Sequence, residues 1–243
     1  KAILKLTLPD GRLLGIDRDS SNLAIAKKTV QGFGDRAVLV QDNYANVKAL
    51  ASTHGFSQVD GILLDLGFSS AHIDEAQRGF SFQLEGPLDM RYDSRQALDA
   101  AEIVNTWSED DLAKIFRQFG EERYARQIAE VICSARKNVE LRTTADLAEL
   151  VASVVRRRGK IHPATRVFQA LRIAVNNELE QLEQALPDMV DLLAPGGRLV
   201  VISFHSLEDR IIKHFFRSQE GKTMTIKTKR VVTPTEEEIK NNQ

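Results

Sequence analysis

The sequence has one cysteine, Cys133, and no long apolar run. A single cysteine excludes an internal disulfide and fits a reducing compartment, so we expect a cytoplasmic protein in which Cys133 packs on an apolar helix face. No stretch is apolar enough to span a membrane, so no membrane partner is predicted. Neither sign of charge is in large excess, since 33 Lys and Arg residues face 34 Asp and Glu residues. Overall charge therefore says nothing about nucleic acid.

Metal-ligand spacing is also missing, because the five histidines and the cysteine form no recognisable motif, and no protein-bound metal is predicted. What is present is a chain of 243 residues, 42% hydrophobic and 28% charged, enough for one large domain or two small ones. Basic residues gather locally at 156–160 and again within 210–230. Such runs are usually solvated faces, and a phosphate contact is the alternative.

The most informative stretch is 59–70, which reads VDGILLDLGFSS. Ile62, Leu63 and Leu64 form a continuous apolar run, which is typical of a parallel strand covered by helices on both faces. Asp65 follows at the end of this strand, where open α/β sheets bind their ligands. A buried carboxylate normally has a partner or ligand, so Asp65 is a candidate functional residue, with capping of the next turn as the alternative.

Two further predicted strands also end in polar residues. The strand within 12–19 leads to Asp17, a candidate for accepting hydrogen bonds from ribose hydroxyls, and a helix is predicted at 22–30. The strand at 37–40 leads to Tyr44, whose ring is a candidate for contact with an adenine. Three such strand ends together favour a nucleoside site.

The sequence opens at Lys1 without a first strand or the glycine loop that would follow it in a nucleotide-binding fold. We therefore expect the chain to begin inside the first helix, with a segment of the natural protein preceding it.

Strand signals stop after 59–70 and resume only at 197–203. Helix starts of the capping-box type are predicted at Ser108 and Thr143, with another helix at 124–132. A long fourth helix is predicted over 168–186 and leads through a Pro-Gly-Gly turn into the last strand.

These patterns predict an α/β fold in which a Rossmann-like sheet is interrupted by a small helical domain. We place the first part of the sheet domain at 1–75, the helical insert at 76–165 and the second part of the sheet domain at 166–243.

Six motifs make this prediction more specific. They are DLGFSS at 65–70, RGFSF at 78–82, GPLDMR at 86–91, GEERYARQIA at 120–129, HPATRVFQALRIAVNNEL at 162–179 and ISFHSLEDRIIK at 202–213. In this order, and over nearly the whole chain, they resemble the bacterial 16S ribosomal RNA cytosine-N4 methyltransferase family, known as RsmH or MraW.

The resemblance implies S-adenosylmethionine as the methyl donor and, as acceptor, a cytosine in the decoding region of 16S ribosomal RNA in the small ribosomal subunit. It also implies a cofactor site with Asp17 at the ribose, Tyr44 beside the adenine, and Asp65 and His72 near the methionine end. His72 stands where the family commonly has glutamine, and Phe68 where a smaller apolar residue is usual. The family's glycine-rich loop would lie immediately before the chain's first residue.

The chemistry of the acceptor explains what such a site must do. Cytosine N4 is a poor nucleophile because its lone pair is delocalised into the ring. Catalysis must therefore place the amine in line with the methyl group and accept hydrogen bonds from the N–H groups of the amine. Asp65 is the predicted catalytic residue, as that acceptor or in orienting the donor. The base must also leave its stack, and we expect contacts from Arg91, Phe80 and Phe82, with packing as the alternative for the two phenylalanines.

Three residues near the end of the predicted insert are candidates for contacts with RNA phosphates or the flipped nucleotide: His162, Arg166 and Arg172. Their alternative is a structural hydrogen-bond network with Asn176 and Glu178.

His205 follows the last predicted strand and is expected to face the same crevice and contact the substrate, with a structural role as the alternative. Two other functions stay open on the residues alone: a nicotinamide-binding oxidoreductase that uses Asp17 for the ribose, and a non-catalytic RNA-binding assembly factor. The sequence leaves the oligomeric state open, with a homodimer as one expectation.

Overall fold

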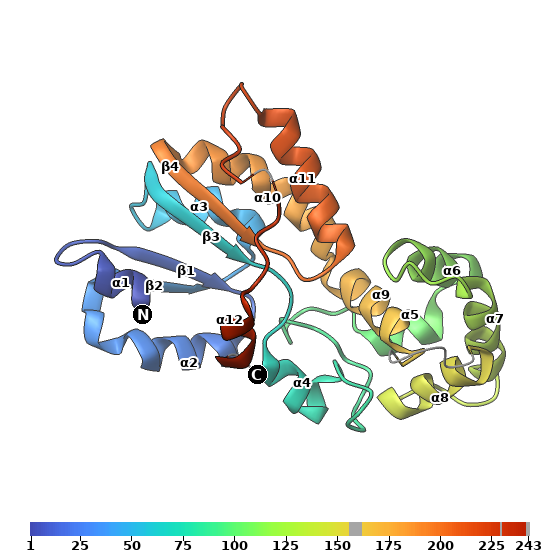
Figure 1. Cartoon of the computed structure of the whole chain (residues 1–243). Coiled ribbons are helices and arrows are strands. Elements are labelled where there is room, and N and C mark those ends of the chain that lie inside the picture. Colours follow the sequence, from blue (N-terminus) through green and yellow to red (C-terminus); the bar gives the residue numbers. More distant parts are fainter. Residues whose placement is uncertain (156–161, 229, 242–243) are drawn as a thin grey trace.

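A computed structural model of the chain describes residues 1–155, 162–228 and 230–241, and it contains parallel strands together with many helices (Figure 1). The strands are β1 (Leu13–Asp17), β2 (Ala37–Gln41), β3 (Val59–Asp65) and β4 (Leu193–Ile202). The strand lobe adds to these the helices α1 (Ala2–Leu6), α2 (Ser20–Val30), α3 (Val47–Thr53), α4 (Ser70–Asp74), α10 (Glu178–Leu192), α11 (Ser206–Gln219) and α12 (Glu236–Asn241). The helical lobe consists of α5 (Ala100–Thr106), α6 (Glu109–Gln118), α7 (Ala125–Ala135), α8 (Thr144–Val154) and α9 (Thr165–Asn176).

The four strands form two parallel pairs. β1 pairs with β2, and β3 pairs with β4, so that Asp17 lies opposite Gln41 and Asp65 opposite Ile202. Figure 1 shows the carboxyl ends of both pairs directed toward the centre of the molecule. The α/β class is as predicted, but within the described residues the strands form two separate two-stranded sheets instead of one continuous sheet, because no ladder joins β1 to β3.

Only one face of β3 is covered. Side chains alternate between the two faces of a strand, and Leu64 packs against a core that α3, α10 and α11 supply. On the opposite face Leu63 is 55% exposed, and Val200 and Ile202 of β4 are 52% and 42% exposed. The prediction of helices on both faces is therefore wrong for the described residues, because these three helices all contribute to the same core.

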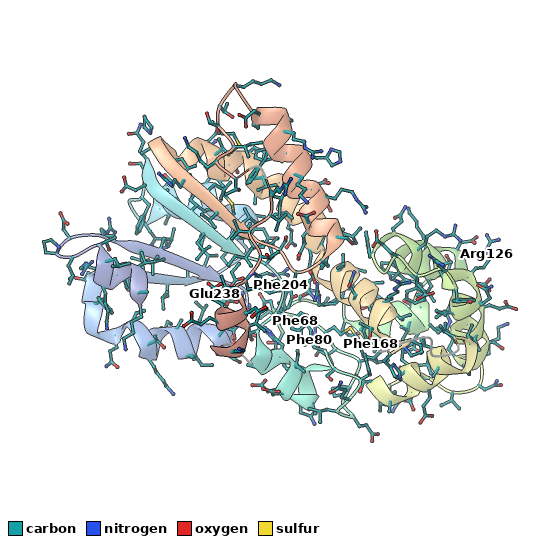
Figure 2. All side chains as sticks on the ribbon, viewed as in Figure 1. Phe68, Phe80, Arg126, Phe168, Phe204 and Glu238 are labelled. Carbon is teal, nitrogen blue, oxygen red and sulfur yellow. The ribbon has the colours of Figure 1, made fainter. Side chains whose placement is uncertain are left out.

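The helical lobe has a hydrophobic core of its own (Figure 2). The largest fully buried side chains of this core are Leu88, Met90, Ile103, Leu112, Phe116, Ile128, Ile132, Leu147 and Leu171. Two predicted helix starts are confirmed, since Ser108 accepts a hydrogen bond from the N–H of Asp111 at the start of α6, and Thr143 forms a capping box with Asp146 at the start of α8.

The long helix predicted over 168–186 is wrong, because the structure has two helices there. Asn177 separates α9 from α10 with φ 51° and ψ 42°, a left-handed conformation that asparagine tolerates better than most residues. Leu171 of α9 is buried in the helical lobe, whereas Leu186 of α10 is buried against the strands. The break therefore lets adjacent helices serve two different cores.

Three smaller expectations can be placed as well. Cys133 is half-buried and packs on the core of the helical lobe, as predicted. Among the described helices, none has the length and apolar character needed to cross a bilayer. The basic cluster at 156–160 falls outside the described residues, as does Lys229.

Candidate functional site

Asp17 is the last residue of β1, and its carboxylate is held in place by the start of the next helix. One oxygen accepts the backbone N–H of Asp19 at 2.8 Å, and the other accepts the side-chain amide of Asn22 at 3.2 Å. A carboxylate has about four acceptor positions, so both oxygens can take further hydrogen bonds. This geometry fits the predicted contact with ribose hydroxyls, which stays a prediction.

Asp65 ends β3, and among the described residues its carboxylate has no hydrogen-bond or ion-pair partner. Partial burial raises the pKa of the Asp65 carboxyl, and no compensating donor lowers it. The alternative, capping of the next turn, is not supported, because no donor among the described residues that follow Asp65 reaches its carboxylate. Asp65 is thus a carboxylate at a strand end with its acceptor positions available to a ligand.

His72 is buried and fully engaged in a hydrogen-bond network. Its Nδ1 accepts the backbone N–H of Ser69 at 3.0 Å, which places the proton of a neutral ring on Nε2, and Nε2 lies 2.6 Å from Asp19 Oδ2. Arg78 completes the network, since its Nη1 lies 2.7 Å from the same Asp19 oxygen. Both ring nitrogens are engaged, and the rings of Phe80 and Tyr92 pack against the imidazole with centroids 4.9 Å and 5.5 Å away. These contacts give His72 a structural role, and its contact with a cofactor stays a prediction.

Asp19 was missed by the sequence prediction, although it precedes α2 at the N-cap position. Burial raises the pKa of Asp19, but hydrogen bonds from the N–H of Ser21 and from Arg78 and His72 outweigh it, so this pKa lies below its ordinary value. The Asp19 carboxylate is therefore a fixed negative charge between β1 and α4.

Tyr44 follows β2 and packs against the core of the strand lobe. Its hydroxyl donates to the backbone carbonyl of Glu178 at 3.4 Å, and burial raises the pKa of Tyr44 well above its ordinary value. This environment gives Tyr44 a structural role at the start of α10, and its contact with adenine stays a prediction.

A buried ion pair joins the end of α9 to the start of α10. Arg172 Nε and Nη2 donate to the two oxygens of Glu178, each at 2.9 Å, and both residues are 8% exposed. Asn176 donates to the backbone carbonyls of Arg172, at 2.9 Å, and of Met90, at 2.7 Å. The structural network that was the alternative for Arg172 is therefore confirmed.

The other predicted substrate residues make contacts within the protein. Arg91 forms a two-pronged ion pair with Asp89, at 2.8 Å and 2.7 Å. His162 stacks on Phe82 with ring centroids 4.6 Å apart, and Phe82 packs on the core of the helical lobe, which confirms packing for this phenylalanine. The side chain of Arg166 is half-exposed, and its Nη1 donates to the backbone carbonyl of Glu121 at 3.3 Å. RNA contacts by Arg91, His162 and Arg166 stay predictions.

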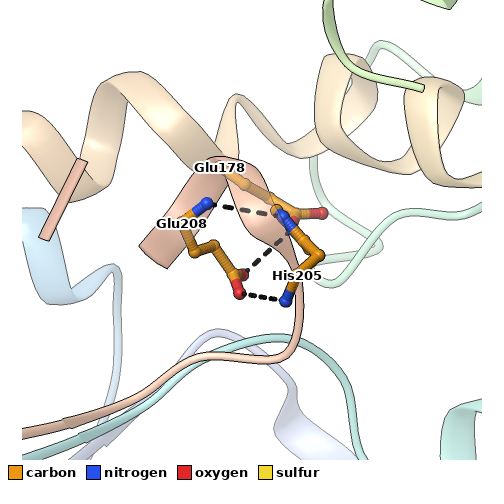
Figure 3. Close-up of side chains that lie close together, drawn as sticks. All are labelled: Glu178, His205 and Glu208. Atoms are coloured by element: carbon orange, nitrogen blue, oxygen red, sulfur yellow. Dashed lines mark hydrogen bonds and ion pairs between the residues drawn. The ribbon is translucent and has the colours of Figure 1, made fainter. Parts of the chain in front are cut away.

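His205 lies beyond β4 and caps α11 (Figure 3). Its Nδ1 accepts the N–H of Glu208 at 3.4 Å, and its Nε2 lies 3.2 Å from a carboxylate oxygen of the same residue. Nε2 is buried and makes no well-formed hydrogen bond within the described residues. Burial raises the pKa of Glu208, but the nearby His205 ring, the hydrogen bond from the N–H of Phe204 and the charge of Arg172 outweigh it, so that this pKa is lowered.

Glu178, His205 and Glu208 bring one ligand atom each within 4.8 Å of one another, a spacing compatible with a metal ion. No sequence motif indicates this group, because Glu178 is far from the other two residues along the chain. Arg172 already occupies both oxygens of Glu178, and the backbone N–H of Phe204 donates to Glu208 at 2.9 Å. These donors favour a hydrogen-bond network over a cation site.

Parallel strands that carry free or well-ordered carboxylates at their carboxyl ends define an α/β protein with its candidate site at those ends. The chain belongs to the MraW methylase family, whose model matches residues 1–243, and it is thus an enzyme of a methyltransferase family. The family resemblance carried by the six motifs is confirmed.

Individual relatives agree with this assignment. The chain is 52% identical over 222 residues to the ribosomal RNA small subunit methyltransferase H of Syntrophotalea carbinolica, a match that covers 90% of this chain and 71% of that protein. It is 52% identical over 220 residues to the protein of the same name from Thermomicrobium roseum, covering 90% and 68% of the two chains. The protein of that name from Coprothermobacter proteolyticus is 48% identical over 242 residues, covering 99% and 80%.

Proposed function

We propose that this enzyme transfers a methyl group from S-adenosylmethionine to the exocyclic N4 of a cytosine in 16S ribosomal RNA of the small subunit. The observation that carries the proposal is the Asp65 carboxylate at the end of β3, which has no partner within the described part of the chain, in a protein of the MraW methylase family. The names of the relatives, which are methyltransferases of small-subunit ribosomal RNA, support the choice of substrate.

The residues at the strand ends fit the methyl donor. Asp17 has acceptor positions left for the ribose hydroxyls, and Asp65 lies at the end of the neighbouring strand pair, where the methionine end would be held. When bound, the sulfonium supplies a methyl group that is already activated for transfer. The protein must then hold the acceptor amine in line with the methyl group and exclude other orientations of that amine.

Asp65 orients the amino group of the acceptor cytosine. Its carboxylate accepts a hydrogen bond from an N4–H of cytosine, which turns the amine toward the methyl group and stabilises the positive charge that develops on N4. Once the methyl group has arrived, the amine proton becomes acidic. The raised pKa of Asp65 makes this carboxylate a better acceptor for that proton than an aspartate with an ordinary pKa would be.

The helical lobe is the proposed site of RNA recognition, as a domain inserted at 76–165 between the two parts of the sheet domain at 1–75 and 166–243. Its separate hydrophobic core supports a domain of its own. Because α9 packs in that core, the packing favours a second boundary nearer Asn177. Arg166 presents a half-exposed guanidinium suited to phosphate. A cytoplasmic location and a homodimer belong to the proposal as predictions.

The direct test is to incubate the protein with isotopically labelled S-adenosylmethionine and small ribosomal subunits that lack the modification, and to identify the labelled nucleoside by mass spectrometry. We expect the label in N4-methylcytosine from 16S ribosomal RNA. Label in another nucleoside would contradict the proposed acceptor. Binding of NAD in preference to S-adenosylmethionine would instead favour an oxidoreductase.

A further inference from the structure

Two aromatic rings lie exposed next to Asp65, at the carboxyl ends of β3 and β4. Phe68 follows β3 and is 38% exposed, and Phe204 follows β4 and is 69% exposed. Because Asp65 lies opposite Ile202 in the ladder, the two phenylalanines leave neighbouring strands at the same end. Figure 2 shows both labelled side chains in this region, between the strands and the helical lobe.

Gly67 precedes Phe68 in the chain and lies against the ring of Phe204. A Cβ added at Gly67 would lie 3.3 Å from the ring of Phe204, so that ring rests directly against the backbone of the residue before Phe68. Gly67 also has φ 83°, a conformation that residues with a Cβ rarely adopt. The loop after β3 is thus shaped so that Phe204 can lie close to it.

Phe68 is supported from inside the protein. The guanidinium of Arg172 lies 4.8 Å from the centroid of the Phe68 ring, within the range of a cation–π contact, and Glu178 holds that guanidinium in place. Phe80 stacks on Phe68 with centroids 6.1 Å apart and an angle of 29° between the rings. A ring fixed in this way loses little conformational freedom when a ligand stacks on it.

Large exposed aromatic side chains next to a carboxylate that no described residue engages match the two parts of a cytosine, an apolar face and an exocyclic amine. Aromatic rings stack on any base, whereas a carboxylate accepts hydrogen bonds from N–H groups and so recognises the amino group of cytosine. On the proposed function, we infer that Phe68 and Phe204 form the surface on which the acceptor cytosine stacks, with its N4 directed at Asp65. The two rings would then hold the cytosine after it has left its stack in the RNA.

The test compares Phe68→Leu and Phe204→Leu with Phe56→Leu as a matched control. Phe56 also has a guanidinium over its ring, since that of Arg12 lies 4.5 Å from the ring centroid. Phe56 precedes β3, however, and so lies at the opposite end of that strand from Asp65. The quantity to measure is kcat/KM for unmodified small ribosomal subunits, together with KM for S-adenosylmethionine and the melting temperature. We expect each of the two site variants to lower kcat/KM for the RNA roughly tenfold, the scale of one base–aromatic stacking contact.

Further readouts separate stacking from simple packing. We expect Phe68→Tyr and Phe204→Tyr to restore most of the loss, because tyrosine keeps the ring, while Phe56→Leu transfers methyl groups at the wild-type rate. Fluorescence of a stacking-sensitive cytosine analogue at the target position should be quenched by the wild-type protein and not by the leucine variants.

Several outcomes would overturn the inference while the proposed function stands. These are leucine variants that keep wild-type kcat/KM, tyrosine variants that fail to restore it, or losses that follow the melting temperature or KM for S-adenosylmethionine. The last of these would mean that the rings pack against protein or cofactor. If the wild-type protein makes no N4-methylcytosine, the proposed function fails, and the inference fails with it.

Discussion

Replacing Arg172 by methionine should strongly destabilise the protein. Methionine keeps the unbranched apolar part of the side chain, but the Glu178 carboxylate loses both hydrogen bonds of 2.9 Å while it stays buried at 8% exposure. The donor that remains to it is the hydroxyl of Tyr92, at 3.3 Å. Removing one partner of a buried ion pair costs about 3–5 kcal/mol, a large part of the roughly 5–15 kcal/mol by which a domain is stable.

Urea unfolding followed by circular dichroism measures this cost as a change in the free energy of unfolding. We expect Arg172→Met to lose about 3–5 kcal/mol, and the double variant Arg172→Met, Glu178→Gln to lose less than the two single variants added together. The control is Arg142→Met, which breaks a surface pair with Glu140 whose side chains are 76% and 55% exposed, and should cost at most about 1 kcal/mol. A loss below about 1 kcal/mol for Arg172→Met, or strict additivity in the double variant, would refute the role of this pair in joining α9 to α10.

Three further predictions concern acid stability and the backbone. The pKa of Asp19 is held below its ordinary 3.8, so its share of stability is present above that pH and is lost as the pH falls through the lowered pKa. Asp19→Asn should therefore flatten the acid side of a plot of melting temperature against pH, and parallel plots would show this to be wrong. Asn177→Ala should lower the free energy of unfolding in urea by about 1 kcal/mol and Asn177→Gly by close to nothing, because glycine adopts the left-handed φ of 51° more readily than alanine. Equal losses would contradict this account of the helix break. Gly86→Ala should lower the melting temperature sharply, because its Cβ would meet the carbonyl oxygen of Ala76, whereas Gly32→Ala meets nothing within 4 Å and should be neutral; a stable Gly86→Ala variant would count against the close approach there.

Local signals explain why some of the structure could be predicted. Ser108 and Thr143 mark helix starts because capping depends on residues only three apart in the chain. Asp17 and Asp65 could be placed at strand ends because each directly follows a short apolar run. The positions of these two carboxylates, and with them the outline of the site, were therefore available from sequence.

The partners of the site residues could not be predicted, because they come together only in the folded chain. His72 and Arg78 meet Asp19 from different segments, and no periodicity relates the three positions. The break at Asn177 was hidden for another reason. Apolar spacing continues from α9 into α10, and a single left-handed residue leaves no mark on that spacing.

The central claim is that the Asp65 carboxylate directs methyl transfer to cytosine N4. The measurement that tests it most directly is the single-turnover rate of transfer to unmodified small ribosomal subunits at saturating S-adenosylmethionine, for Asp65→Asn beside Asp60→Asn, an exposed aspartate near the other end of the same strand. The account predicts a fall of about 100-fold or more for Asp65→Asn, because the amide keeps an acceptor oxygen but lacks the negative charge that stabilises N4 in the transition state and takes its proton, and a wild-type rate for Asp60→Asn. Transfer by Asp65→Asn at the wild-type rate would contradict it.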